Sequence, residues 1–127
     1  MANEFTIPAF KASLANGNLK ETMADEAAIN DDQATKGISE HVQSIPTTAA
    51  GTALTMTNIT TAGWSFFKNT EASGGNFVEV GVQVAATFHP FLKVKAGKWQ
   101  WIYLSTNAPY ARADTGAVKL HHKIAEA

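Results

Sequence analysis

Apolar and polar residues alternate along the second half of the chain, and a period of two predicts β-strands. The stretch "GWSFFKN" places Trp64 and Phe66 on one face of a strand and Ser65 with Phe67 on the other. The next stretch, "NFVEVGV", places its three valines on one face. Because the intervening "TEASGG" has the length and the glycines of a turn, we expect these two strands to form a hairpin of the core.

The alternation continues through "HPFLKVKAGKWQWIYLS" and "GAVKLHHKI", which predict three further strands. Both faces of residues 99–104 are apolar, so we expect this strand either to lie centrally in its sheet or to present one face to another subunit. In the last strand the residues expected to point inward are Val118, Leu120, His122 and Ile124. Strands at a spacing of roughly ten residues, with turn signals between them, indicate an all-β sandwich or barrel.

The first part of the chain is poorer in core side chains, and its elements are predicted mainly from turn signals. The opening "EFTIPAFKASLANGNLKETM" reads as a hairpin, because Asn16-Gly17 favours the positive φ angles of a tight turn. Pro8 cannot donate a ladder hydrogen bond, so the first strand is expected at a sheet edge or in a bulge. We expect a loop over residues 24–37, with one helical turn at most, and strands in "ISEHVQSI" and "TALTMTNI".

The chain has 127 residues and no linker or internal repeat, which fits a single domain over residues 1–127. We expect an antiparallel, jelly-roll-like β-sandwich of about eight strands, with residues 1–15 forming an N-terminal arm or an edge hairpin. The tryptophans, the tyrosines and most phenylalanines lie after residue 62, so that part should supply most of the core. The alternation also favours core packing over a sugar-stacking platform for the aromatic set Trp64, Trp99, Trp101 and Tyr103.

Charged residues make up only 17% of the chain, against about 25% in an average protein, which indicates a surface that is largely neutral or covered by a partner. The net charge of −1 gives no electrostatic basis for binding nucleic acid. The chain has no cysteine, which excludes disulfides, thiolate catalysis and cysteine-bound zinc. No apolar run approaches the roughly 18 residues of a membrane span, and "MANEFTIPAF" lacks the features of a signal peptide. We therefore expect a protein made in the cytoplasm that binds neither nucleic acid nor membrane.

The sequence shows no recognisable catalytic, metal-binding or cofactor-binding motif. Adjacent His121 and His122 on a strand point to opposite faces, so they cannot share one metal; we expect one to be exposed and one hydrogen-bonded at the core edge. The acidic cluster within residues 25–32 lacks the spacing of a calcium loop and is expected to be solvated. Glu79 and Asp114 are the least unsuitable carboxylate pair, but nothing in their spacing supports glycoside cleavage. We therefore expect no enzymatic activity, metal or cofactor.

Two polar stretches, "SIPTTAAGT" and "STNAPYARADTG", are expected to be exposed loops. In the second loop, Tyr110 and Arg112 would form a compact aromatic and polar patch able to contact a partner. The alternative is a structured turn in which Tyr110 packs down onto the domain. The residues alone do not decide between the two.

The order of four stretches resembles small structural proteins of tailed bacteriophages: "ITTAGWSFFKN", "NFVEVGV", "FHPFLKVKAGKWQWIYLS" and "PYARADTGAVKLHHKI". Those proteins typically show "N-[FY]-V-E-[IV]-G", then "P-x-[LF]-K-[LV]-K-x-G-[EK]", then "Y-A-[KR]-A-[DN]-T-x-A-V-x-L". The opening "MANEF … NGNLKET" is similar to theirs as well. Lys98 stands where the family often has an acidic residue, and His121-His122 replaces an apolar or acidic pair. The resemblance covers most of the chain and carries no catalytic residue.

This resemblance implies a non-enzymatic virion protein, in the first place a capsid decoration (cement) protein that stabilises the head by binding neighbouring major capsid proteins at the capsid surface. The alternative is a tail or host-adsorption protein that binds a receptor or a carbohydrate. Copies of the chain are expected to form a dimer or trimer around a symmetry axis. The expected partner contacts are Phe5, Ile7 and Phe10 in the N-terminal segment, and Tyr110 and Arg112 in the second polar loop.

Overall fold

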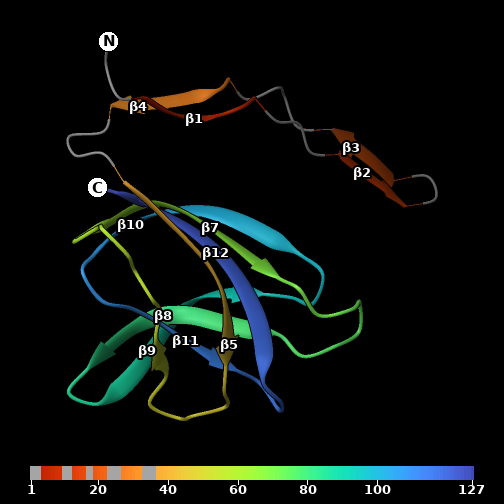
Figure 1. Cartoon of the computed structure of the whole chain (residues 1–127). Helices are drawn as coiled ribbons and strands as arrows, with labels where there is room; N and C mark the ends of the chain where they lie inside the picture. Colours follow the sequence, from red (N-terminus) through yellow and green to blue (C-terminus); the bar gives the residue numbers. More distant parts are fainter. Residues whose placement is uncertain (1–3, 10–12, 17–18, 23–26, 33–36) are drawn as a thin grey trace. The chain divides into compact units, whose positions relative to one another are not determined.

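The computed structural model describes residues 4–9, 13–16, 19–22, 27–32 and 37–127. The chain divides into two compact units, residues 1–34 and 35–127. Throughout the described residues, all regular structure is β-strand, as the alternation predicted (Figure 1). The first unit holds two short two-stranded sheets, and the second holds two sheets of four strands each.

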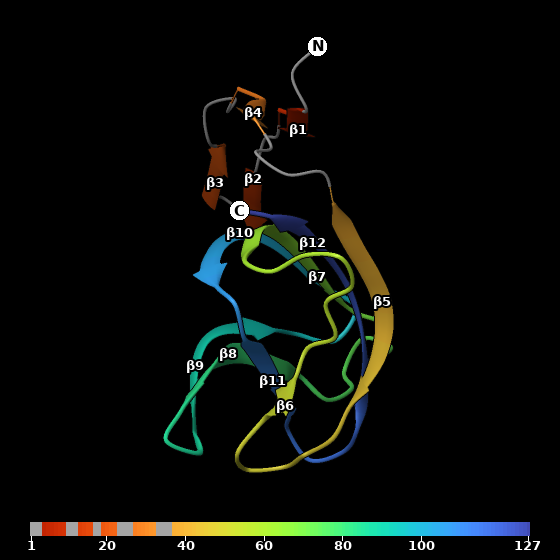
Figure 2. The same ribbon diagram turned by 60° about the vertical axis from the view of Figure 1, so that its left-hand side comes forward.

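The second unit is a sandwich of two antiparallel sheets that enclose one core (Figure 2). Its strands are β5 (Ile38–Ile45), β6 (Thr52–Ala53), β7 (Ala62–Asn69), β8 (Val78–Val84), β9 (Thr87–Val94), β10 (Trp99–Thr106), β11 (Pro109–Ala113) and β12 (Val118–Glu126). The first sheet has the order β10-β7-β12-β5, and the second sheet has the order β6-β11-β8-β9.

The strand pairs are nested about one tight turn. β8 pairs with β9 around this turn, β7 pairs with β10, β6 pairs with β11, and β5 pairs with β12. A long hairpin rolled up in this way, with its pairs falling alternately into two sheets, is the jelly roll of two Greek keys. The expected antiparallel, jelly-roll-like sandwich of about eight strands is therefore confirmed.

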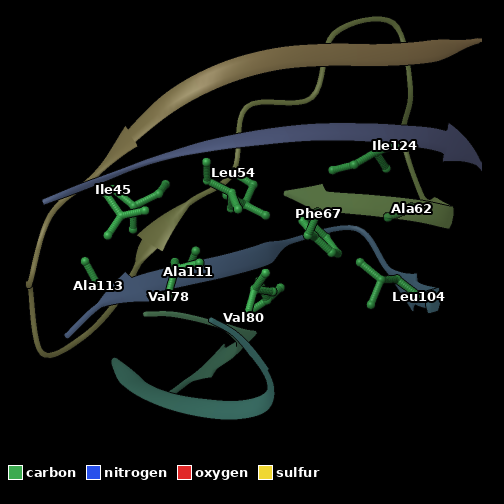
Figure 3. Packing of buried hydrophobic residues seen from close by; sticks show 13 residues of the cluster. Ile45, Leu54, Ala62, Phe67, Val78, Val80, Leu104, Ala111, Ala113 and Ile124 are labelled. Atoms are coloured by element: carbon green, nitrogen blue, oxygen red, sulfur yellow. The ribbon is translucent and has the colours of Figure 1, made fainter. Parts of the chain in front are cut away.

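The core lies between the two sheets and is mostly aliphatic (Figure 3). Phe67 of β7 is fully buried there, and the valines Val78 and Val80 of β8 lie on the opposite sheet. Most of the core comes from the second half of the chain, as expected, although Ile45 and Leu54 contribute from before residue 62. In the last strand, the four residues predicted to point inward are all buried.

The expected hairpin between residues 63 and 82 is wrong. β7 and β8 lie in different sheets, so "TEASGG" connects one layer of the sandwich to the other. β7 pairs instead with β10 and β12, both of which are distant in sequence. Turn residues and alternation are the same for a hairpin and for a sheet-to-sheet connection, because only the pairing partners differ.

Two further expectations about the second unit are corrected. Of the two alternatives for residues 99–104, the central position is wrong, because β10 lies at an edge of the first sheet. The segment expected to be an exposed loop around Tyr110 forms strand β11, which lies between β6 and β8. Ala111 and Ala113 are small enough to pack against the core from this strand, and both are buried.

The first unit contains β1 (Glu4–Ile7), β2 (Ser13–Asn16), β3 (Leu19–Thr22) and β4 (Ile29–Asp32). β2 and β3 pair as the hairpin predicted from Asn16-Gly17, with Asn16 opposite Leu19. β1 ends directly before Pro8 and pairs with β4. The loop expected over residues 24–37 is therefore wrong at β4, which pairs with β1 as a strand. The sequence of β4 shows no alternation of apolar and polar residues from which this strand could have been predicted.

Candidate functional site

A cluster of aromatic side chains lies on the outer face of the first sheet, the face that points away from the second sheet. Strand alternation separates it from the core: Ser65 and Phe67 of β7 are fully buried, whereas their neighbours Trp64 and Phe66 are only partly buried. We call this cluster the aromatic face; its members are Trp64, Phe66, Trp99, Trp101 and Tyr103.

The rings of the aromatic face contact one another across β7 and β10. Tyr103 lies opposite Trp64 in the strand register, and their rings meet edge to face with centroids 5.4 Å apart. Phe66 lies opposite Trp101, with ring centroids 5.2 Å apart, and its ring is 5.9 Å from that of Trp99. Such cross-strand aromatic pairs stabilise a sheet and hold the rings in fixed positions.

Part of this cluster is open to solvent. Trp99 is 58% exposed and Tyr103 is 47% exposed, although both are large hydrophobic side chains. The prediction that the tryptophans pack into the core is therefore wrong. Alternation shows that the aromatic residues share a face, but it does not show which face is inward. On β10 the inward position belongs to Leu104, which is buried.

Polar and charged side chains of β12 and β5 border the aromatic face. The His121 ring meets Phe66 edge to face at 6.0 Å, and the Lys123 Nζ lies 5.9 Å from the centre of the same ring. His121 Nε2 is 2.9 Å from Glu40 Oε1, and this hydrogen bond is the main reason that the pKa of Glu40 lies below its usual value. The face therefore combines flat apolar rings with charges at its border, which suits binding to a protein surface or to sugar rings.

His122 points the opposite way, into the sandwich, and is fully buried. Gln43 is held by backbone partners, because its Nε2 donates to the Ala53 carbonyl and its Oε1 accepts from the Thr55 N–H. His122 Nε2 lies 3.2 Å from this Oε1, so it must be the nitrogen that carries the proton. The Nδ1 atom is then a buried acceptor with no hydrogen-bond partner in the structure.

Burial is the main cause that lowers the pKa of His122 from 6.5 to about 4, and the nearby His41 and His121 act in the same direction. His122 is therefore neutral at physiological pH. The expectation of one exposed histidine and one hydrogen-bonded at the core edge is met only in part: His121 is partly buried and lies 2.9 Å from Glu40, and His122 is hydrogen-bonded but fully buried.

The residues predicted to contact a partner belong to both units of the chain. Arg112 extends from the outer face of the second sheet, where its guanidinium forms an ion pair with Glu79 at 2.8 Å and lies 5.0 Å from the Phe88 ring. Its Nη1 also donates to the Ala49 carbonyl at 3.3 Å. Tyr110 is half-buried on the same strand.

The other predicted contacts belong to the first unit. Phe5 and Ile7 lie in β1, where Ile7 is buried, and Phe10 lies outside the described residues. Partner binding by these residues and by β11 stays a prediction.

The described part of the chain gathers no group of three histidine, aspartate or glutamate side chains that could hold a metal ion. Of the two carboxylates considered for glycoside cleavage, Glu79 forms an ion pair with Arg112, and Asp114 is exposed directly after β11. Nor do the described residues include a helix of the length and apolarity that crossing a membrane requires.

Comparison of the chain with protein-family models, with curated proteins and with solved structures gave no match. The aromatic face is therefore interpreted from its own chemistry. One sequence signal did indicate it: both faces of residues 99–104 are apolar, and a strand of this kind in a sandwich of two sheets leaves one apolar face on the outside.

Proposed function

We propose that this chain is a non-enzymatic virion structural protein that decorates a bacteriophage capsid by binding neighbouring major capsid proteins. The observation that carries the proposal is the aromatic face, in which Trp99 and Tyr103 are about half exposed on a rigid sheet. Jelly rolls occur in viral capsid proteins and in lectins, so the fold permits this function without deciding it. The resemblance of the sequence to small phage structural proteins is the reason for proposing a bacteriophage capsid as the partner.

An aromatic face on a sheet is well suited to docking. Tryptophan and tyrosine contribute large contact areas at a low cost in conformational entropy, and they are enriched among the residues that dominate binding energy. Because β7 is held between β10 and β12, the rings keep their positions when they meet a partner. On a capsid lattice, many weak contacts of this kind add up through avidity.

The first unit supports the same proposal. Its described residues form two two-stranded sheets, β1 with β4 and β2 with β3. A two-stranded sheet by itself is only marginally stable in water, so contact with a partner surface would stabilise these strands. We propose that Phe5, Ile7 and Phe10 meet a capsid protein or a neighbouring copy, and that Tyr110 and Arg112 provide a second contact.

The first test is quantitative mass spectrometry of purified virions from the phage that encodes the chain. A copy number equal to that of the major capsid protein, or a simple fraction of it, is the expected result. A few copies per particle would replace the proposal with a tail component. Absence from the particle would overturn the virion assignment altogether.

The second test locates the contact. Phe66→Lys places a charge at the centre of the aromatic face, on an interior strand, and should abolish binding to particles that lack the protein. Phe91→Lys is the matched control, because Phe91 is 50% exposed on β9 of the second sheet. Equal binding by both variants would show that the aromatic face is not the docking surface.

A second candidate function is carbohydrate binding in a tail or host-adsorption protein, and the exposure of Trp99 favours it. Sugar rings stack on exposed aromatic side chains, so glycan binding would shift tryptophan emission and protect it from acrylamide quenching. Phe91→Lys should leave such a shift intact, whereas Phe66→Lys should remove it. An emission spectrum that no glycan of a broad panel changes would exclude this candidate.

A further inference from the structure

The four edge strands of the second unit differ in how they are protected against pairing with another chain. β6 is only two residues long. β9 carries Pro90 and Lys93, and its register against β8 shifts at Val80/Gly81. β5 carries the exposed Glu40. Short strands, prolines, charges and bulges are the features by which proteins keep sheet edges from associating.

Between Trp99 and Tyr103, where it pairs regularly with β7, β10 has none of these protective features. Residues Trp99–Thr106 include no charged residue and no proline, and the register shift comes only after Tyr103. Among the described strands, β10 pairs on one side only, with β7. Its edge is therefore a long, apolar and uncharged template for a further strand.

The backbone of β10 is oriented for such pairing. The Asn69 N–H donates to the Lys98 carbonyl at 2.9 Å, which sets the phase of the ladder between β7 and β10. Hydrogen-bonded positions alternate along an antiparallel pair, so the even-numbered residues from Lys98 onward face β7. The N–H and C=O groups of Trp99 and Tyr103 consequently point away from β7, toward the edge of the first sheet.

The strand is also complementary to itself. A two-fold axis perpendicular to the sheet can place Trp99 of one copy opposite Tyr103 of the other, at both ends of the pairing. Both side chains belong to the outer face, so the paired rings would lie on the same side of the joined sheet. Lys98 would then lie opposite Leu104, and no like charges would face each other across the pairing.

We infer that β10 pairs antiparallel with β10 of a second copy of this chain, which joins two first sheets into one continuous eight-stranded sheet. The two copies contribute four rings that are each about half exposed in the single chain. An interface of this size is at the small end of specific ones, so we expect a dissociation constant in the micromolar range. The inference does not rest on capsid binding.

The test is sedimentation equilibrium of the full chain with two charged variants. One variant combines Trp99→Lys with Tyr103→Lys, and the other combines Trp99→Glu with Tyr103→Glu. Each variant alone puts like charges opposite each other at both ends of the pairing, which should weaken dimerisation by at least about tenfold. Mixing the two variants puts lysine opposite glutamate at both ends and should restore a dimer.

Restored association in the mixture also shows that the variants are folded. Phe91→Lys, on the edge of the second sheet, is the control and should dimerise as the wild type does. A wild-type chain that stays monomeric from micromolar to near-millimolar concentration would overturn the inference. The edge of β10 would then pair with residues of the same chain or with a strand of another protein. A wild-type dimer together with a mixture that stays monomeric would also overturn it. An intact dimer that fails to bind capsids would count only against the proposed function.

Discussion

The side-chain amide of Asn69, at the end of β7, donates a hydrogen bond to the carbonyl of Val94, at the end of β9, over 3.1 Å. The same nitrogen donates to the Asn76 carbonyl at 2.8 Å, and Oδ1 accepts from the Glu71 N–H at 3.0 Å. The Asn69 backbone carbonyl accepts from the Gly97 N–H. The buried Asn69 therefore links both connections between the sheets on this side: its side chain bonds to residues 70–77 and to the end of β9, and its backbone carbonyl bonds to residues 95–98.

Replacing Asn69 with alanine should destabilise the protein strongly. The change removes three hydrogen bonds and leaves buried backbone groups without partners, which should cost about 3 kcal/mol of unfolding free energy. Urea denaturation followed by tryptophan fluorescence measures it. Asn107→Ala is the matched control, since Asn107 is exposed and should change stability by less than about 0.5 kcal/mol. A loss below about 1 kcal/mol for Asn69→Ala would contradict this role.

Acid should destabilise the protein through His122. The folded-state pKa of about 4 lies below the unfolded value of 6.5, so the unfolded chain takes up a proton first as the pH falls. The contribution to stability is complete above pH 6.5 and is lost as the pH falls toward 4, by about 3 kcal/mol over the window. Protonation would place an N–H at the buried Nδ1, where the structure offers no acceptor.

The measurement is the free energy of unfolding between pH 4 and 7 for the wild type and for His122→Gln. The variant should lose stability at neutral pH but should lack most of the acid-dependent loss. His89→Gln, at an exposed histidine, should follow the wild-type curve. Parallel curves for the wild type and His122→Gln would mean that another group causes the acid sensitivity.

Substitutions in the turn between β8 and β9 should increase the stability of the protein. Ala85 and Ala86 both have positive φ angles, 49° and 63°, and they connect the paired residues Val84 and Thr87. This conformation favours Asn-Gly and is unfavourable for alanine. Ala85→Asn and Ala86→Gly should each raise the unfolding free energy by about 0.5–1 kcal/mol.

Ala117→Gly provides the comparison for these turn variants. Ala117 is exposed and its φ is not positive, so glycine there should bring no gain. Thermal unfolding distinguishes the cases: the melting temperature should rise for the turn variants and not for the control. A fall for Ala86→Gly would show that the turn does not have this geometry in solution.

Gly81 should not tolerate any side chain. An added Cβ would overlap the His89 carbonyl oxygen and would lie 2.7 Å from Pro90 Cα, and neither backbone atom can move away at low cost. Gly81→Ala should therefore lose several kcal/mol or fail to fold. Gly74→Ala meets no atom within 4 Å and is strained only by its φ of 88°, so it should lose about 1–2 kcal/mol. The soluble yield and the melting temperature of the two variants should both be lower for Gly81→Ala than for Gly74→Ala. The opposite result would contradict the close approach of β8 and β9.

The sequence allowed most strands to be recognised but not their pairing. Alternation located β12 and correctly assigned its inward residues, because burial on one face imposes a period of two. It could not reveal that β7 pairs with β10 and β12 rather than with β8. Pairing between residues far apart depends on the packing of the whole sandwich, which no local window contains.

The candidate site was only partly predictable for similar reasons. The apolar pattern on both faces of β10 indicated a surface that meets another subunit, but equally a central strand. Around Tyr110, alanines and polar residues resemble a loop, since alanine has little intrinsic preference for strands. β11 exists because Ala111 and Ala113 fit closely against the core, which is a property of the assembled sandwich.

The place of β12 has a consequence for how the protein is made. It lies between β7 and β5 in the first sheet, yet it follows every other strand in the sequence. On the ribosome, β5 lacks β12, its neighbour among the described strands, until β12 has emerged, so the first sheet is completed only after the rest of the sandwich has been synthesised. Such long-range pairing makes folding slow and leaves apolar strands uncovered in the meantime. High-level expression should therefore make the nascent chain dependent on chaperones that shield the strands already formed.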